Sequence, residues 1–261
     1  MIPYFELLSF SIGPLTIQVW GLLVVLGMLV GLLLTLRLAK IRALSNAVIM
    51  DMAIWGIVGG LIGGRLFYVL FYALDYFILN PIEIFQFWRG GASSLGGLVG
   101  AMVGIILLAC FKKISWRELF PYFDILSIGF WLGWGIGRLG CFFIHDHPGR
   151  LTNCWLAVNF PTATRYDLGL FESLLALLIF LFIFIWFKKQ YKHAGRVFVV
   201  GFWIYSIVRF FLDFLRAEDL PQSDVRWLAL TPAQWGMAVL FFILTFWLFR
   251  DKIRRKSQSI D

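Results

Sequence analysis

Arg65, Arg138 and Arg209 each stand inside a long apolar stretch of the sequence. An arginine in hydrocarbon is costly, so such a residue normally faces a bundle interior, a charged partner or a water-filled cavity. Its planar guanidinium presents a fork of N–H donors that matches a phosphate, whereas a lysine offers only a point charge. These residues therefore predict a phosphate site inside a membrane protein.

The three arginines fall at similar depths along their predicted helices. Arg65 follows Asp51 by fourteen residues, which is about 21 Å of helix. Arg209 follows Arg196 by thirteen residues, or about 20 Å. Arg138 lies about 31 Å beyond the base of its own helix before any tilt. We predict all three in the outer half of the membrane, where a phospholipid headgroup is the expected ligand.

The alternative is that each arginine pairs with a buried carboxylate. Asp213 lies four residues after Arg209, a spacing that brings two helical side chains together. For Arg209 alone, the pairing and the phosphate interpretation stay equally open. No acid stands near Arg65 or Arg138 within their apolar stretches, so for the set we favour the phosphate pocket.

Residues 137–149, GRLGCFFIHDHPG, place His145, Asp146 and His147 at the end of a glycine-rich run. On a regular helix these three neighbours would point in different directions, but the Pro-Gly pair that follows them predicts a turn. Histidine suits proton transfer near neutral pH, and a neighbouring carboxylate can fix its tautomer. We expect His145 or His147 to act as a base, unless the turn merely closes the helix.

A metal site or a disulfide is only weakly indicated. The HxH pair lacks a third ligand at suitable spacing, and Cys110, Cys141 and Cys154 show no metal-type pattern. Cys141 and Cys154 could pair on an oxidising face. We therefore predict no metal and no cofactor.

The surrounding elements are long and apolar. Apolar residues make up 61% of the chain and charged residues 15%, against about 45–50% and 25% in soluble domains. Runs of about 20 apolar residues match the thickness of a bilayer. We predict an all-α, seven-transmembrane-helix bundle, with spans near residues 14–36, 48–72, 95–111, 122–143, 170–187, 197–215 and 232–249.

Basic residues follow the first, third, fifth and seventh runs and are sparse in the other loops. These clusters are Arg37, Lys40 and Arg42; Lys112, Lys113 and Arg117; Lys188, Lys189, Lys192 and Arg196; and Arg250, Lys252, Arg254, Arg255 and Lys256. Cytoplasmic loops carry such an excess, so the N-terminus is predicted outside and the C-terminus in the cytoplasm. Topology thus accounts for the net charge of +8, and no nucleic-acid partner is predicted.

Short loops predict a single polytopic domain over residues 1–261. Two outer segments are longer than connectors. Residues 73–94 predict an amphipathic helix in the interface, with Phe87 and Trp88 at headgroup level. Residues 144–169 are polar and predict a small external cap. Glycines cluster within the second and fourth runs, where they predict close helix packing and room for a lipid headgroup.

Motifs along nearly the whole chain carry a resemblance to one family. They are SIGPLTIQVWGLLVVLG at 11–27, GGRLFYVLFY at 63–72, GGASSLGGLVG at 90–100, GRLGCFFIHDHPG at 137–149 and VRFFLDFLR at 208–216. The sequence resembles the prolipoprotein diacylglyceryl transferase family, whose hallmark GR-x-G-N-F-x-N-x-E-x-x-G matches the fourth of these motifs. The family moves a diacylglyceryl group from phosphatidylglycerol to the thiol of a lipobox cysteine.

The sequence departs from the family at several polar positions. Leu95 stands where the family usually has a histidine, and Trp20 where it has a tyrosine. The hallmark asparagines appear as Cys141 and Ile144, and the glutamate as Asp146. The chain is therefore a divergent member, in which the HDHPG turn is predicted to take over the proton transfer of the missing histidine.

The resemblance implies a bacterial inner-membrane enzyme with phosphatidylglycerol, membrane lipid and a prolipoprotein lipobox as partners. Arg138 and Arg209, with Arg65 assisting, would hold the phosphate as glycerol phosphate leaves. Gly149 is predicted beside the phosphate as a further substrate-binding residue, and the predicted supporting residues are Trp20, Glu172 and Asp213. The alternative is a non-catalytic or transporting relative that keeps the lipid pocket. An anion channel is a weaker third possibility, because no polar stripe accompanies the arginines.

Overall fold

A computed structural model of the chain describes residues 1–86, 90–190, 193–220, 223 and 226–258. The chain divides into two compact units, one formed by Met1–Arg37 with Phe123–Asp261 and the other by Leu38–Tyr122. Each unit is described by itself. That the whole chain forms one domain stays a prediction.

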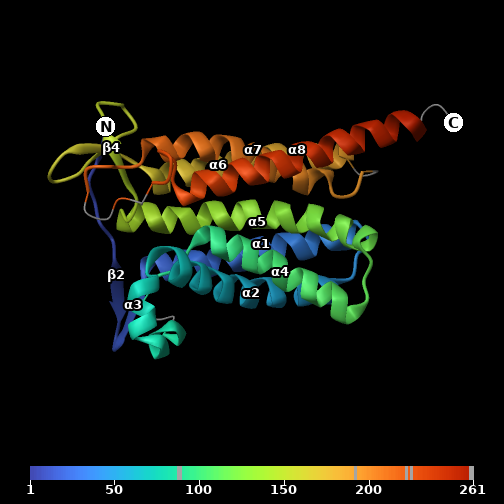
Figure 1. The fold of residues 1–261 in the computed structure, drawn as a ribbon, viewed down its shortest axis with the longest axis horizontal. Helices are drawn as coiled ribbons and strands as arrows, with labels where there is room; N and C mark the ends of the chain where they lie inside the picture. The colour runs from blue at the N-terminus through green and yellow to red at the C-terminus, as the bar shows by residue number, and fades with distance from the viewer. Residues whose placement is uncertain (87–89, 191–192, 221–222, 224–225, 259–261) are drawn as a thin grey trace. The chain divides into compact units, whose positions relative to one another are not determined.

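Long helices dominate both units (Figure 1). Those of the first unit are α1 (Val19–Ile41, up to Arg37), α5 (Trp116–Ile144, from Phe123 on), α6 (Leu168–Phe187), α7 (Arg196–Leu212) and α8 (Pro232–Gln258), with the short 3-10 helices η3 (Lys188–Gln190) and η4 (Asp213–Leu215). Those of the second are α2 (Asn46–Tyr72), α3 (Leu74–Leu79), η1 (Pro81–Phe85) and α4 (Ser94–Lys112).

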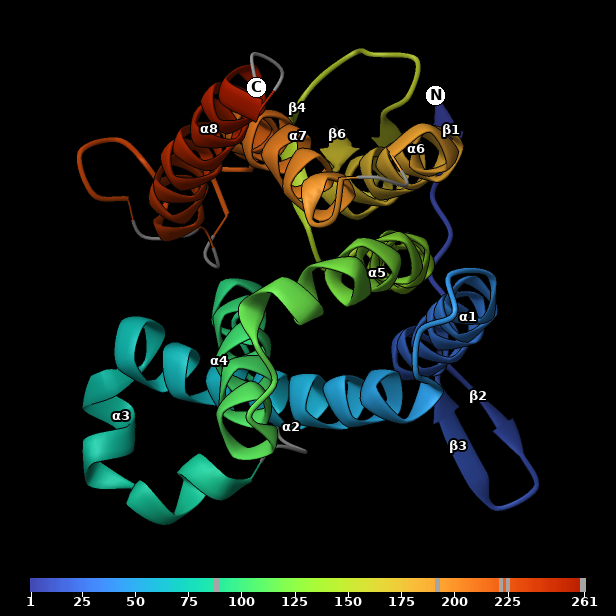
Figure 2. The ribbon, with the colours of Figure 1, turned by 90° about the vertical axis from the view of Figure 1, so that its right-hand side faces the viewer.

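Seven of the described helices are long and apolar enough to cross a membrane, which confirms the predicted number of spans. Large apolar side chains such as Leu29, Leu61 and Leu178 are exposed on them, as on helices that face lipid. The helix α5 is the most buried of the seven, and its Trp131 is fully enclosed. In the first unit α5 lies beside α6 and α7 (Figure 2).

Glycines allow helices to touch through their backbones, as predicted. In the first unit, a Cβ atom on Gly133 of α5 would lie 2.5 Å from the carbonyl oxygen of Gly27 on α1. In the second unit, a Cβ atom on Gly59 of α2 would lie 2.4 Å from the carbonyl oxygen of Gly100 on α4. A larger residue at either place would push the helices apart.

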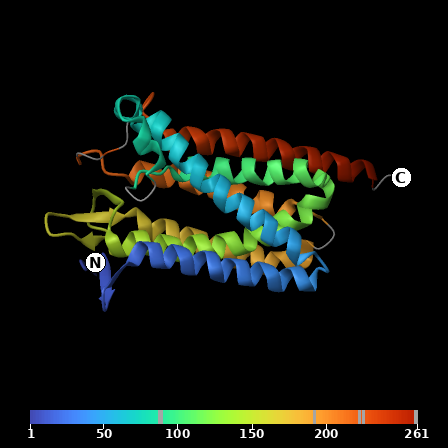
Figure 3. The same ribbon diagram turned by 90° about the horizontal axis from the view of Figure 1, so that it is seen from below.

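The segment predicted as an external cap forms a small sheet, which the all-α prediction did not include. Its strand order is β1-β5-β6-β4, with β1 parallel to β5 and the other pairs antiparallel. The strands are β1 (Ile2–Pro3), β4 (Pro148–Leu151), β5 (Val158–Asn159) and β6 (Thr164–Asp167). A separate hairpin joins β2 (Ser9–Ile12) to β3 (Leu15–Gln18). The cap lies at the opposite end of the first unit from the end of α8 (Figure 3).

The predicted amphipathic segment is only partly helical. It forms the short helix α3 and the 3-10 helix η1, separated by Asn80. The side chain of Phe77 is buried against this unit, whereas Leu79 and Ile82 are exposed, which fits an interfacial position. Phe87 and Trp88 lie outside the described residues.

Candidate active site

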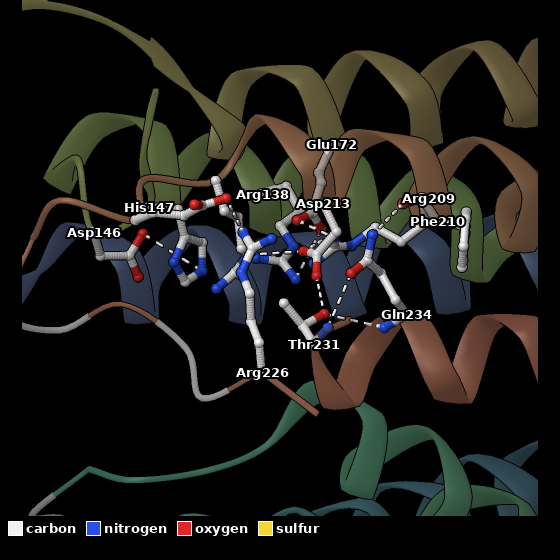
Figure 4. Close-up of polar contacts among 12 residues, drawn as sticks. Arg138, Asp146, His147, Glu172, Arg209, Phe210, Asp213, Arg226, Thr231 and Gln234 are labelled. Carbon is white, nitrogen blue, oxygen red and sulfur yellow. Dashed lines mark hydrogen bonds and ion pairs between the residues drawn. The ribbon is translucent and has the colours of Figure 1, made fainter. Parts of the chain in front are cut away.

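Two of the three membrane arginines meet on one buried carboxylate (Figure 4). Arg138 on α5 places Nη2 2.9 Å from Oε2 of Glu172, and Arg209 on α7 places Nε 3.3 Å from Oε1 of the same residue. Glu172 on α6 is fully buried, and each arginine is less than a tenth exposed. Three helices thus join at one charged centre, because an isolated charge at this depth would be costly.

The network continues to a second buried carboxylate. Asp213 accepts a hydrogen bond from Arg209 Nη1 at 2.6 Å and pairs with Arg216 Nε at 2.9 Å. The hydroxyl of Thr231 at the start of α8 donates to its other oxygen. The ion pair between Arg209 and Asp213, which the sequence left open as the alternative to a phosphate contact, is therefore present. Among the described residues of this network, three arginines pair with two carboxylates, which is an excess of positive charge.

The sequence analysis did not single out Arg216 or Thr231. Arg216 could have been found, because it stands three residues after Asp213 and ends the VRFFLDFLR motif. Thr231 is eighteen residues from Asp213 and carried no such signal. Glu172 was selected only through the family resemblance, since its partner Arg138 is on another helix.

Arg65 belongs to the second unit, and its role differs from the predicted phosphate contact. Its guanidinium has five N–H donors, and backbone carbonyls accept hydrogen bonds from every nitrogen. The acceptors are the carbonyl oxygens of Glu83, Ile84, Gln86, Gly90 and Gly91. Arg65 therefore holds the segment after α3 in place, and no donor is left over for a phosphate.

His145 is an anchor within the turn. Its Nδ1 lies 2.6 Å from the Asp167 carboxylate, and its Nε2 lies 2.7 Å from the carbonyl oxygen of Phe5. Burial acts to lower the pKa of His145, but the hydrogen bond and charge of Asp167 outweigh it and hold this pKa above its ordinary value. Both ring nitrogens are occupied, so of the two predicted bases the structure favours His147.

Asp146 and His147 border a cavity of about 240 Å³. The wall also includes Arg216, which joins the cavity to the arginine network. His147 Nε2 lies 3.8 Å from Oδ1 of Asp146. Burial raises the pKa of Asp146 to about 6. Burial, then Arg138 and Arg216, hold the pKa of His147 below its ordinary value, so its ring is neutral near pH 7.

Comparisons with known proteins agree with this geometry. The family model described as prolipoprotein diacylglyceryl transferase matches residues 8–250. The chain belongs to this family. The phosphatidylglycerol--prolipoprotein diacylglyceryl transferase of Nitrosomonas europaea is 32% identical, covering 95% of this chain and 91% of its own. Those of Oleidesulfovibrio alaskensis and Pasteurella multocida are 34% and 32% identical, over 84% and 83% of this chain and 82% and 81% of their own.

The predicted family, and with it the prediction of a diacylglyceryl transferase, is thus confirmed. Of two family positions, Gly149 has a packing role in this chain and Trp20 is exposed. A Cβ atom on Gly149 would lie 2.6 Å from the carbonyl oxygen of Leu215 and 2.8 Å from Cβ of Tyr166, so only glycine fits there. Trp20 opens α1 with 47% of its surface exposed, as expected for an aromatic residue near an interface.

Cys141, which replaces a hallmark asparagine of the family, lies inside the site. Its Sγ is 3.8 Å from Nη1 of Arg138, one turn earlier on α5. It forms no disulfide with Cys154, and Cys110 is free as well. The open alternative of a Cys141–Cys154 pair is therefore not realised. Leu95 lies in the first turn of α4 in the second unit.

Proposed function

We propose that this chain transfers a diacylglyceryl group from phosphatidylglycerol to the thiol of a prolipoprotein lipobox cysteine, at the outer side of a bacterial inner membrane. The excess positive charge around Glu172 supports this proposal most directly. Arg138, Arg209 and Arg216 face two carboxylates, and a phosphodiester would supply the remaining negative charge. The excess favours an anionic headgroup over a zwitterionic one.

Transfer requires charge stabilisation on the leaving group. As the glyceryl carbon–oxygen bond breaks, negative charge grows on glycerol phosphate. The guanidinium groups of Arg138 and Arg209 are already oriented by Glu172, so they stabilise this charge without reorganising. Preorganised donors of this kind contribute about 3–4 kcal/mol each in a dry site.

Transfer also requires a thiolate, because a free thiol with a pKa of about 8.5 is mostly protonated near pH 7. The proton is released at the HDHPG turn, where Asp146 and His147 line the cavity. His145 holds the turn in position through Asp167 and Phe5. On this proposal the turn takes over the proton transfer of the histidine that Leu95 replaces.

A reconstituted assay tests this function. The purified chain is placed in vesicles with phosphatidylglycerol and a synthetic lipobox peptide, and the peptide mass is followed. We expect a diacylglyceryl adduct on the peptide cysteine and none on a cysteine-to-serine peptide. Vesicles of phosphatidylethanolamine alone should give no product. Binding of phosphatidylglycerol without an adduct would instead favour the non-catalytic, lipid-binding alternative.

Complementation provides the matching test in cells. A strain depleted of its own diacylglyceryl transferase should regain growth and lipoprotein processing when it expresses this chain. The Arg138→Ala variant at equal membrane abundance serves as the control and should not restore growth. Rescue by this variant would show that the arginine network is not part of the activity.

A further inference from the structure

Three possible metal ligands come together where α5 ends. The thiol of Cys141, a carboxylate oxygen of Asp146 and a ring nitrogen of His147 all lie within 4.8 Å of one another. Cys141 stands in the last turn of the helix, and His145 follows with a left-handed backbone, φ 50°. This conformation turns the chain sharply, which returns Asp146 and His147 toward Cys141.

The donor set has a defined chemistry. Thiolate, imidazole and carboxylate are the ligands that Zn²⁺ takes in proteins, and catalytic zinc sites keep three protein ligands and one open position. With metal–ligand bonds of about 2.0–2.3 Å, neighbouring ligand atoms lie about 3.3–3.8 Å apart. The 3.8 Å between His147 Nε2 and Asp146 Oδ1 is slightly longer than a nitrogen and an oxygen ligand of one ion require. Small rotations of the side chains would complete the site.

We propose that Cys141, Asp146 and His147 bind a Zn²⁺ ion whose open fourth position takes the thiol of the acceptor cysteine. This inference rests on the proposed transferase function and names the device that activates the acceptor. It also replaces the prediction of no metal, which was made because the HxH pair had no third ligand. The third ligand is Cys141. It lies before the HDHPG turn in the sequence, in the last turn of α5.

Charge balance supports a dication at this place. The thiolate of Cys141 and the carboxylate of Asp146 together offset its two charges. Two arginines lie close by: Arg138 places Nη1 3.8 Å from Cys141 Sγ, and Arg216 lines the same cavity as Asp146 and His147. Arg138 is paired with Glu172 at 2.9 Å and Arg216 with Asp213 at 2.9 Å, so neither opposes the metal with a full unpaired charge.

Access to the fourth position comes from the cavity. Asp146 and His147 line it, with side chains 36% and 27% exposed, while Cys141 is 6% exposed and lies behind them. A metal held by all three therefore lies at the cavity wall. The cavity of about 240 Å³ leaves room for an acceptor side chain next to the metal.

The step balances as a substitution at carbon. The acceptor thiol coordinates the metal and releases its proton to water, because a metal-bound thiol is deprotonated. The thiolate sulfur attacks the glyceryl carbon that bears the phosphate, so an S–C bond forms and a C–O bond breaks. The electron pair leaves with glycerol phosphate, which the arginines stabilise. Arg138 contacts both Cys141, a ligand of the proposed metal, and Glu172, which orients the arginines. The groups that activate the attacking thiolate and those that stabilise the leaving group therefore meet at Arg138.

Metal binding is tested on the full purified chain, independently of transfer. The protein is stripped with a chelator, loaded with Zn²⁺ and dialysed, and its metal content is measured. We expect one ion per chain in the wild type and a large loss in Cys141→Ala, Asp146→Asn and His147→Gln. Co²⁺ loading should give a thiolate-to-metal absorption band that Cys141→Ala abolishes. The matched controls Cys110→Ser and Cys154→Ser should keep both signals.

Transfer is then measured on the stripped and reloaded protein. A free thiol with a pKa of about 8.5 is only about 3% thiolate at pH 7, so we expect stripping to slow transfer on the order of 30-fold there. The loss should shrink at pH 9.5, where the peptide thiol ionises by itself, and binding of phosphatidylglycerol should not change.

Four results would overturn the inference. Full transfer by the stripped protein would show that the reaction needs no metal, and the proposed function would stand. A cobalt band that survives Cys141→Ala would place the metal elsewhere. A diacylglyceryl adduct on Cys141 itself, formed without peptide, would show covalent catalysis instead. Absence of transfer under every metal condition, with phosphatidylglycerol bound, would contradict the proposed function as well.

Discussion

Arg65 and the pair Arg138 and Arg209 are buried to the same degree, at 4%, 8% and 5% exposure, yet their partners differ. Within the described part of the chain, Arg65 donates only to backbone carbonyls, which cannot leave or change charge. Arg138 and Arg209 instead share the carboxylate of Glu172. The same residue type therefore holds the backbone in one unit and belongs in the other to the network for which we propose phosphate binding.

The largest effect is expected from the arginine pair. Arg138→Ala or Arg209→Ala should reduce transfer by about 10²–10³-fold, because each removes a donor aimed at the leaving phosphate. Arg138→Lys and Arg209→Lys should recover little, since a lysine loses the two-pronged geometry. The peptide mass assay measures this loss. Full activity of both lysine variants would contradict the phosphate contact.

Next in size is the removal of the shared carboxylate. Glu172→Gln leaves two buried arginines without their common partner, and breaking a buried pair in this way costs about 3–5 kcal/mol. We expect a large fall in the thermal unfolding midpoint in detergent. The control is Arg150→Gln, which breaks an ion pair with Glu218 that is exposed on both sides and should leave the midpoint near that of the wild type. An unchanged midpoint for Glu172→Gln would mean that the network is not held by this charge.

A smaller and different effect is expected at Arg65. Arg65→Lys keeps the charge but offers three donors in place of five, and each hydrogen bond to a charged group is worth about 1.5–3 kcal/mol. The midpoint should fall, while transfer per folded molecule should stay far closer to wild type than in Arg138→Lys. If Arg65→Lys instead lost transfer without loss of stability, the structural role of Arg65 would be wrong.

The orientation of the chain in the membrane can be tested without changing any of the three arginines. A reporter fused after Lys256 should be cytoplasmic, and one inserted near Thr152 should be external, because basic residues concentrate after alternate helices. Neither fusion should change stability. The reverse result would move all three arginines to the inner half of the membrane and exclude an outer-leaflet lipid.

Local patterns were enough to predict the spans and one ion pair. Apolar run length gave seven membrane helices, and the four-residue spacing of Arg209 and Asp213 gave their contact. Both depend only on the period of a helix, which is fixed by the backbone. The family motifs likewise pointed to Glu172 and the HDHPG turn before any contact was known.

Contacts between helices were decided by the tertiary structure. Arg138 meets Glu172 across two helices, and nothing in their spacing of thirty-four residues could select that partner. The sequence could not predict that backbone carbonyls are the partners of Arg65, because every residue carries a carbonyl. Cys141 joins Asp146 and His147 only because the backbone of His145 turns into the left-handed region. The sequence determined which side chains the membrane must bury, and the packing of the helices decided what each of them binds.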